Sequence, residues 1–94
     1  MLQEELKLDG NAIAGVLREI FAVEMTVADE TCGHCGSVAP LGRVDVYMNA
    51  PGIVVRCPFC TQILMTIVTA RDRVWLDLSG VRQLQLPVPS ETPP

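Results

Sequence analysis

The chain has 94 residues and a net charge of −4, and 49% of its residues are apolar although only four are aromatic. This length predicts one domain, too short for a self-sufficient hydrophobic core, so a metal or a partner is expected to add stability. The acidic balance argues against nucleic-acid binding, because phosphate contacts need a basic surface.

The start of the chain and its apolar runs predict where the protein resides. The first ten residues, MLQEELKLDG, are acidic and polar, unlike a signal peptide. The longest uncharged run after the first cysteine pair, residues 57–70, is too short for a membrane span. We therefore expect a cytoplasmic protein with no membrane contact.

Charge is distributed unevenly along the chain. Residues 1–31 carry two basic and seven acidic side chains, a net charge of −5. Residues 32–86 carry five arginines and three aspartates, a net charge of +2. The helical half is thus acidic, and the remainder lacks a basic stripe.

One amphipathic helix is predicted near the N-terminus, after an N-terminal extension at residues 1–8. Asp9 is a suitable N-cap, and the helix is expected to end near Val23. The apolar residues that follow the cap fall on one face of a helix. They are Ala12, Ile13, Val16, Leu17, Ile20 and Phe21.

Beyond the first cysteine pair the apolar period changes to two, which predicts strands. Asn49-Ala50-Pro51-Gly52 and Arg71-Asp72-Arg73 are turn sequences between them. The four strands are expected at residues 44–48, 53–56, 63–70 and 74–78. Four prolines in residues 83–94 predict a disordered tail, so the domain should cover residues 9–82. The predicted fold class is small α+β, with the N-terminal amphipathic helix packed on an antiparallel sheet.

The cysteines form the pattern C-x2-C-x21-C-x2-C. In a cytoplasmic protein two such pairs favour metal over disulfides, because two thiolates three residues apart can grip one ion from a tight turn. Gly36 can take the left-handed conformation that ends the first turn. Thr61 occupies the equivalent position of the second turn, where glycine would be more favourable. The segment between the two cysteine pairs has the length of one hairpin. The predicted ligands of one structural Zn²⁺ are Cys32, Cys35, Cys57 and Cys60.

Two redox alternatives compete with zinc. Cys32-Gly33-His34-Cys35 matches the motif of protein disulfide isomerases, but that chemistry needs a helix after the first cysteine, and Gly36 to Gly42 is a poor helix. The paired turns also resemble those of rubredoxins, which hold iron among aromatic residues that this chain mostly lacks.

Other residues favour structural roles over catalysis. His34 lies between two ligands and is expected to be exposed, and Trp75 is expected to pack against the helix or be partly exposed. The arginines of the sheet are expected to lie on a solvated face. No catalytic set, cofactor-binding loop or small-molecule site is evident, so we predict that the protein is not an enzyme.

With the cysteines placed, the chain resembles an uncharacterised family of short bacterial zinc-ribbon proteins over residues 8–80. The resemblance rests on both cysteine pairs, on Leu8 to Ala12 and on Val74 to Leu78, together with Pro51-Gly52 and Arg56-Cys57-Pro58. It implies the same fold and zinc site. More distantly, the chain is similar to the zinc domain of hydrogenase-maturation nickel chaperones, which bind nickel through a histidine after the initiator Met, where this chain has Leu2.

The expected function is that of a protein–protein interaction adaptor or regulator. The helix stripe needs one face of the sheet, and the other face would carry Tyr47 and, depending on register, Val55 or Met65. That leaves apolar area for a protein partner or a homo-oligomer. Two alternatives are a nucleic-acid-associated ribbon, acting in transcription or on ribosomes, and a zinc or redox sensor whose thiolates release the metal on oxidation.

Overall fold

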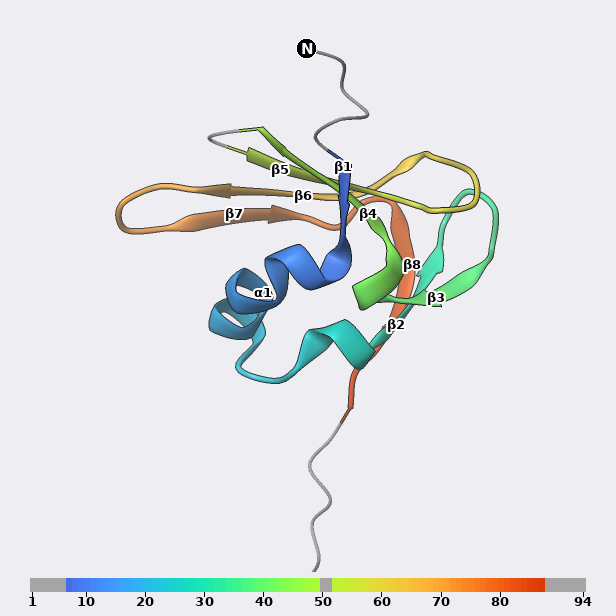
Figure 1. Cartoon of the computed structure of the whole chain (residues 1–94), viewed down its shortest axis with the longest axis horizontal. Helices are drawn as coiled ribbons and strands as arrows, with labels where there is room; N and C mark the ends of the chain where they lie inside the picture. Colours follow the sequence, from blue (N-terminus) through green and yellow to red (C-terminus); the bar gives the residue numbers. More distant parts are fainter. Residues whose placement is uncertain (1–6, 50–51, 88–94) are drawn as a thin grey trace, which may run out of the picture.

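Two antiparallel sheets and one helix build the molecule (Figure 1). The structure is a computed structural model, and it describes residues 7–49 and 52–87. The larger sheet has the strand order β1-β4-β5-β6-β7, and the smaller sheet has the order β3-β2-β8. The small α+β class is confirmed, but the two cysteine-bearing turns belong to different sheets, the first to the smaller sheet and the second to the larger one.

The chain passes from the larger sheet to the smaller one and back, and its last described strand belongs to the smaller sheet. Short 3-10 helices lie between several of them, at Gly10–Ile13, Met25–Val27 and Leu41–Arg43. The regular elements are β1 (Lys7–Asp9), α1 (Ala14–Phe21), β2 (Asp29–Cys32), β3 (Val38–Pro40), β4 (Asp45–Asn49), β5 (Gly52–Arg56), β6 (Ile63–Thr69), β7 (Val74–Asp77) and β8 (Val81–Gln85).

The helical segment begins and ends as its capping residues dictate. The carboxylate of Asp9 accepts a hydrogen bond of 3.0 Å from the Asn11 N–H, which confirms the N-cap, although the first turn is a 3-10 helix. The segment ends at Phe21, two residues before the expected end. Ala22 adopts the left-handed conformation there, with φ of 62°, and its N–H bonds the Arg18 carbonyl at 2.8 Å.

The helix packs against one face of the larger sheet. Ile13 and Leu17 are buried in the same core as the central row of sheet residues, where Val46 pairs with Val55 and Val55 pairs with Met65. Val55 and Met65 are therefore fully covered, and the expectation that one of them faces outward is wrong. The apolar stripe is otherwise confirmed except at Ala12, which is exposed.

The opposite face of the larger sheet, here called the open face, has no helix on it among the described elements. By strand alternation it carries Tyr47 and Val54, which are paired, and Val68 and Trp75, which are also paired. Trp75 is 54% exposed, and it lies on the face away from the helix. The Arg56 guanidinium stacks over the Tyr47 ring, 5.9 Å from its centroid.

The smaller sheet was not expected from the sequence. Its strand β8 includes Gln83, Leu84 and Gln85, which pair with Thr31, Glu30 and Asp29 of β2. The expected start of a disordered tail at residue 83 is therefore wrong, and the expected domain border falls inside a strand. Residues 88–94 of that tail lie outside the described residues, as does the centre of the turn at residues 50–51.

The N-terminal extension also needs correction. Lys7 and Leu8 form β1 together with Asp9, and they pair with Tyr47 and Val46 at the edge of the larger sheet. Residues 1–6 lie outside the described residues.

Candidate metal centre

The two cysteine pairs form two turns with the same backbone hydrogen bonds. In the first turn the Gly36 N–H bonds the Cys32 carbonyl, and in the second the Thr61 N–H bonds the Cys57 carbonyl, both at 3.0 Å. Gly36 and Thr61 have positive φ angles of 78° and 67°. The predicted left-handed position is confirmed in both turns, including the one where a β-branched residue must adopt it.

Backbone N–H groups point at the first sulfur of each turn. The Cys32 Sγ accepts from the His34 N–H at 3.3 Å, and the Cys57 Sγ accepts from the Phe59 N–H at 3.4 Å. Such donors stabilise a thiolate, the form that binds metal. The two turns are thus preorganised in the same way.

The four sulfur atoms lie at the spacing of a tetrahedral metal site. The ligand atoms of Cys32, Cys35, Cys57 and Cys60 all lie within 4.8 Å of one another. The Cys32–Cys60 and Cys35–Cys57 sulfur pairs are each 3.7 Å apart. A tetrahedron with metal–sulfur bonds of about 2.3 Å has edges of about 3.8 Å, whereas a disulfide would need about 2.05 Å. The predicted ligands therefore converge on a cluster able to hold one metal ion.

The cluster has a buried side and an exposed side. Cys32 and Cys57, the first cysteine of each turn, are buried, whereas Cys60 is half-buried and Cys35 is exposed. Ser37 joins the two turns on the exposed side, with its hydroxyl 3.0 Å from the Cys35 sulfur and 3.6 Å from the Cys57 sulfur. Sequence reasoning missed Ser37, because its proximity to Cys57 exists only once the turns face each other.

The surroundings of the sulfurs shift their pKa values in opposite directions. The hydrogen bond with the Ser37 side chain lowers the pKa of Cys35 to about 6. Burial acts to raise the pKa of Cys57, but hydrogen bonds from the backbone of Cys60 and Phe59 outweigh it and lower the value. The backbone of Gln62 acts to lower the pKa of Cys60, but burial and the other sulfurs raise it to about 12. Without a metal, four sulfurs so close cannot all be ionised, and a divalent cation removes that repulsion.

The turn between β7 and β8 holds the two arms of the site together. The Gly33 N–H of the first turn bonds the Gly80 carbonyl at 2.8 Å, and the Gly80 N–H bonds the Leu64 carbonyl of β6 at 3.0 Å. A Cβ on Gly80 would lie 2.0 Å from the Ile63 carbonyl oxygen, so only glycine fits this approach. The second turn is braced further by Arg56, which donates to the Thr61 carbonyl at 2.9 Å.

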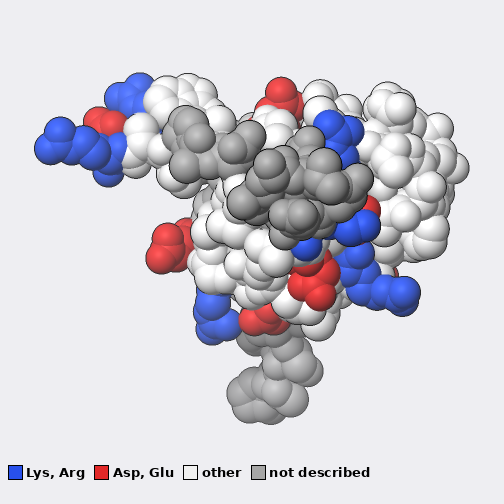
Figure 2. All heavy atoms as spheres, turned by 45° about the horizontal axis from the view of Figure 1, so that its top comes forward, with Lys and Arg blue, Asp and Glu red and all other residues white. Residues whose placement is uncertain are grey.

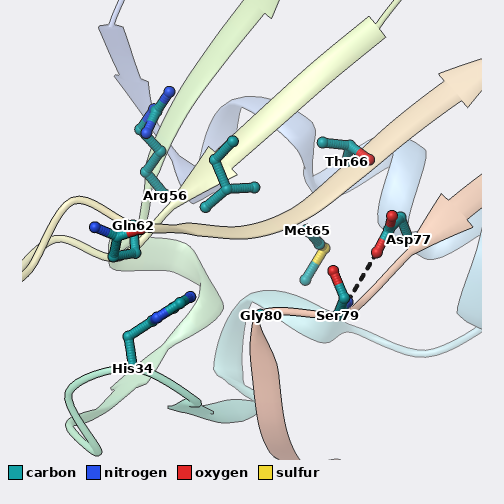
Figure 3. A pocket seen from close by; sticks show the side chains of 9 residues that line it. His34, Arg56, Gln62, Met65, Thr66, Asp77, Ser79 and Gly80 are labelled. Atoms are coloured by element: carbon teal, nitrogen blue, oxygen red, sulfur yellow. Dashed lines mark hydrogen bonds between the residues drawn. The ribbon is translucent and has the colours of Figure 1, made fainter.

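A pocket of about 400 Å³ lies beside the first turn (Figure 3). His34 is exposed, as expected, and projects from the first turn toward the pocket, whose opposite side is formed by Asp77 and Ser79. A hydrogen bond of 2.9 Å joins the Asp77 carboxylate to the Ser79 N–H and lowers the pKa of Asp77. His34 thus lines this pocket from the turn that carries two of the sulfurs.

Glu30 is a buried acid close to the cluster that sequence reasoning also missed. It lies in β2 two residues before Cys32, its side chain is fully buried, and neither carboxylate oxygen has a hydrogen-bond partner in the structure. Burial, followed by the negative charges of Cys57 and Asp29, raises the pKa of Glu30 to about 7. In the sequence Glu30 is one of seven acidic residues in an acidic segment, and only the pairing of β2 with two neighbours encloses it.

A helix that crosses a membrane must be long and apolar. None of the helices in the described part of the chain is long and apolar enough to cross a membrane.

Comparison with known proteins identifies a family. The chain belongs to the family described as "Family of unknown function (DUF6510)", whose model matches residues 3–89. No curated protein matched the chain, and no solved structure matched it. The expected likeness to the zinc domain of nickel chaperones stays a prediction. The paired cysteines and their convergence in space are the features from which a role can be argued.

Proposed function

We propose that this protein is a non-enzymatic zinc-ribbon protein in which the four cysteines hold one structural Zn²⁺, and that it serves as a protein–protein interaction module. The observation that supports the metal most directly is the spacing of the sulfurs, 3.7 Å in each of the cross-turn pairs Cys32–Cys60 and Cys35–Cys57. Zinc prefers this tetrahedral thiolate set and needs no redox partner.

The donor set favours a structural role. A catalytic zinc keeps one position open for water or substrate, whereas four thiolates complete the tetrahedron. Cys32 ends β2 of the smaller sheet, and Cys57 directly follows β5 of the larger sheet, so one ion would fasten the two sheets together. Metal binding of this kind contributes folding free energy.

Zinc is favoured over iron by the surroundings of the site. Phe59, within the second turn, is 63% exposed, and Cys35 is exposed too. The aromatic shielding that rubredoxins give their iron is not built at this turn.

Metal analysis of protein purified without added metal tests this assignment. We expect about one zinc per chain and no visible absorption. Cys57→Ser should lose the metal, whereas Ser37→Ala, which removes a neighbour and no ligand, should keep it. A red protein with about one iron per chain would replace zinc by iron.

The interaction role is supported by the open face of the larger sheet. Tyr47, Val54 and Trp75 give it apolar and aromatic area. Within its strands the charged residues are two basic and three acidic, which supports a protein partner over nucleic acid. They are Lys7, Arg56, Asp9, Asp45 and Asp77.

Capture from the native cytoplasm tests the interaction role. Tyr47→Glu should abolish capture of a specific protein while zinc content is unchanged. The matched control is Val27→Glu, which places the same charge on an exposed apolar residue outside both sheets. Capture of nucleic acid with steep salt dependence would instead favour the transcription or ribosome alternative.

A further inference from the structure

Strand β7 forms an open edge of the larger sheet. Within the described residues it pairs with β6 on one side and with no strand on the other. The β6–β7 hairpin runs past the helix, and its tip projects on the side away from the cysteine turns (Figure 1), where its end carries both signs of charge (Figure 2). Val74 and Trp75 of β7 are 45% and 54% exposed. A strand with free backbone groups and exposed apolar residues is a template for another strand.

The hydrogen bonding of the hairpin shows which backbone groups are free. The Ala70 N–H bonds the Arg73 carbonyl at 2.9 Å, so these two residues form a hydrogen-bonded pair. In an antiparallel ladder such pairs alternate, and Trp75 therefore directs its backbone groups toward its partner Val68 in β6. Val74 and Leu76 direct their N–H and C=O groups outward. The outer edge thus offers two donors and two acceptors.

From this edge we infer that β7 pairs antiparallel with β7 of a second copy of this chain, which joins two five-stranded sheets into one. The residues with outward backbone groups form the hydrogen-bonded pairs. Val74 pairs with Leu76 of the second copy, and Leu76 pairs with Val74 of the second copy. Trp75 then faces Trp75 of the second copy in the pair without hydrogen bonds, where side chains approach most closely. A two-fold axis passes between the two tryptophans, as in a closed dimer.

Charge complementarity supports this register over its neighbours. Centred on Trp75, the pairing places Arg73 opposite Asp77 of the second copy, and symmetry makes this contact twice. A shift by two residues in either direction places Arg73 or Asp77 against a tryptophan. Among the ion pairs of the described residues, Arg73 contacts Asp72 alone, at 3.5 Å and in solvent, so little opposes its new pairing.

The sequence of β7 lacks the devices that keep edge strands apart. Its central residues are Val74, Trp75 and Leu76, with neither proline nor charge among them. The charges stand at the ends and have opposite sign, which an antiparallel copy neutralises. The other edge of this sheet, β1, has three residues and a charge at both Lys7 and Asp9.

The inference deepens the interaction role proposed above by naming a second copy as a partner, and it does not depend on the metal. The test uses the full zinc-loaded chain and measures mass by sedimentation equilibrium over a concentration series. We expect a monomer–dimer equilibrium. The one tryptophan of the chain should report it as a shift of emission to shorter wavelength as concentration rises.

A charge-swap cycle identifies the register. Arg73→Asp and Asp77→Arg should each weaken the dimer on the order of 10-fold, because each replaces two attractions by two repulsions. The double variant Arg73→Asp/Asp77→Arg should restore the dimer to within about 3-fold. Arg71→Asp is the matched control, since Arg71 lies in the turn and has no opposite charge in this register, and it should leave the dimer unchanged.

A backbone variant tests the edge itself. Val74→Pro removes an outward N–H that β6 does not use, so it should give a monomer that keeps its zinc. A wild-type monomer at all concentrations, or a double swap that fails to restore the dimer, overturns the pairing. A monomeric chain that captures a different protein through Tyr47 likewise overturns it, but leaves the proposed function standing.

Discussion

The two arms of the metal site have nearly the same backbone but different side chains. Each arm is a strand that enters a cysteine turn, and the N–H of the first cysteine bonds the carbonyl five residues later, Ser37 in one arm and Gln62 in the other, both at 2.9 Å. In the second arm, the residue two positions before the first cysteine is Val55, an aliphatic residue that suits the core. The first arm has Glu30 at the equivalent place, and both are fully buried.

The arms also differ at the residue that ends each turn. Gly36 and Thr61 both have positive φ angles, although a β-branched residue is strained there. The second arm has a brace that the first lacks among the described hydrogen bonds, from Arg56 to the Thr61 carbonyl. Both arms therefore share the backbone geometry that brings four cysteines into one cluster, while each arm tolerates one unfavourable residue at a different position.

Removal of a ligand should have the largest effect on both arms. Cys57→Ser should unfold the protein, because zinc binding contributes roughly 10–16 kcal/mol in small zinc domains and a short core cannot offset its loss. Cys35→Ser removes the exposed ligand, and its loss of thermal stability should be smaller. Circular dichroism melts with zinc titration measure both. Unchanged melting of Cys57→Ser would show that the metal is not structural.

The buried acid should make the first arm sensitive to pH. The folded protein holds the Glu30 proton up to about pH 7, whereas the unfolded chain releases it near the usual value of 4.5. The unfolded state therefore binds fewer protons between these values, and the contribution of Glu30 to stability falls as pH rises from about 4.5 to about 7. Glu30→Gln should remove this contribution and gain on the order of 1–3 kcal/mol at neutral pH.

The measurement is the difference in unfolding free energy between variant and wild type, in urea with saturating zinc, from pH 5 to 8. This difference cancels the pH dependence of the cysteines. It should grow with pH and level off above about 7. Glu19→Gln, on the exposed side of α1, is the control and should show no such growth. A constant difference across the range would contradict the buried-acid account.

The smallest expected effect is the exchange of the residues that end the turns. Thr61→Gly should stabilise the second arm by about 0.5–1 kcal/mol, because relief of the left-handed strain exceeds the added entropy of the unfolded chain. Gly36→Thr should destabilise the first arm by about 1–2 kcal/mol. A Cβ on Gly36 meets no atom within 4 Å, so this loss comes from the backbone alone. Urea unfolding of both variants gives the values, and opposite signs to these would refute the comparison.

The sequence alone predicts the features that depend on neighbouring residues along the chain. The four cysteines of the cluster, the left-handed residues of both turns, the N-cap at Asp9 and the strands around residues 44–77 follow from spacing and from periods of 2 or 3.6 residues. These patterns depend on neighbours along the chain, so they survive without knowledge of the fold.

Only the tertiary structure decided what depends on contacts between distant segments. Strands β2, β3 and β8 show no clear alternation of apolar and polar residues, and β2 and β8 pair across about fifty residues of sequence. The burial of Glu30 follows from the pairing of β2 with its two neighbours, whereas the Ser37 bridge and the close approach at Gly80 follow from how the two sheets meet. A local sequence pattern cannot contain them, because each partner arrives from a separate part of the chain.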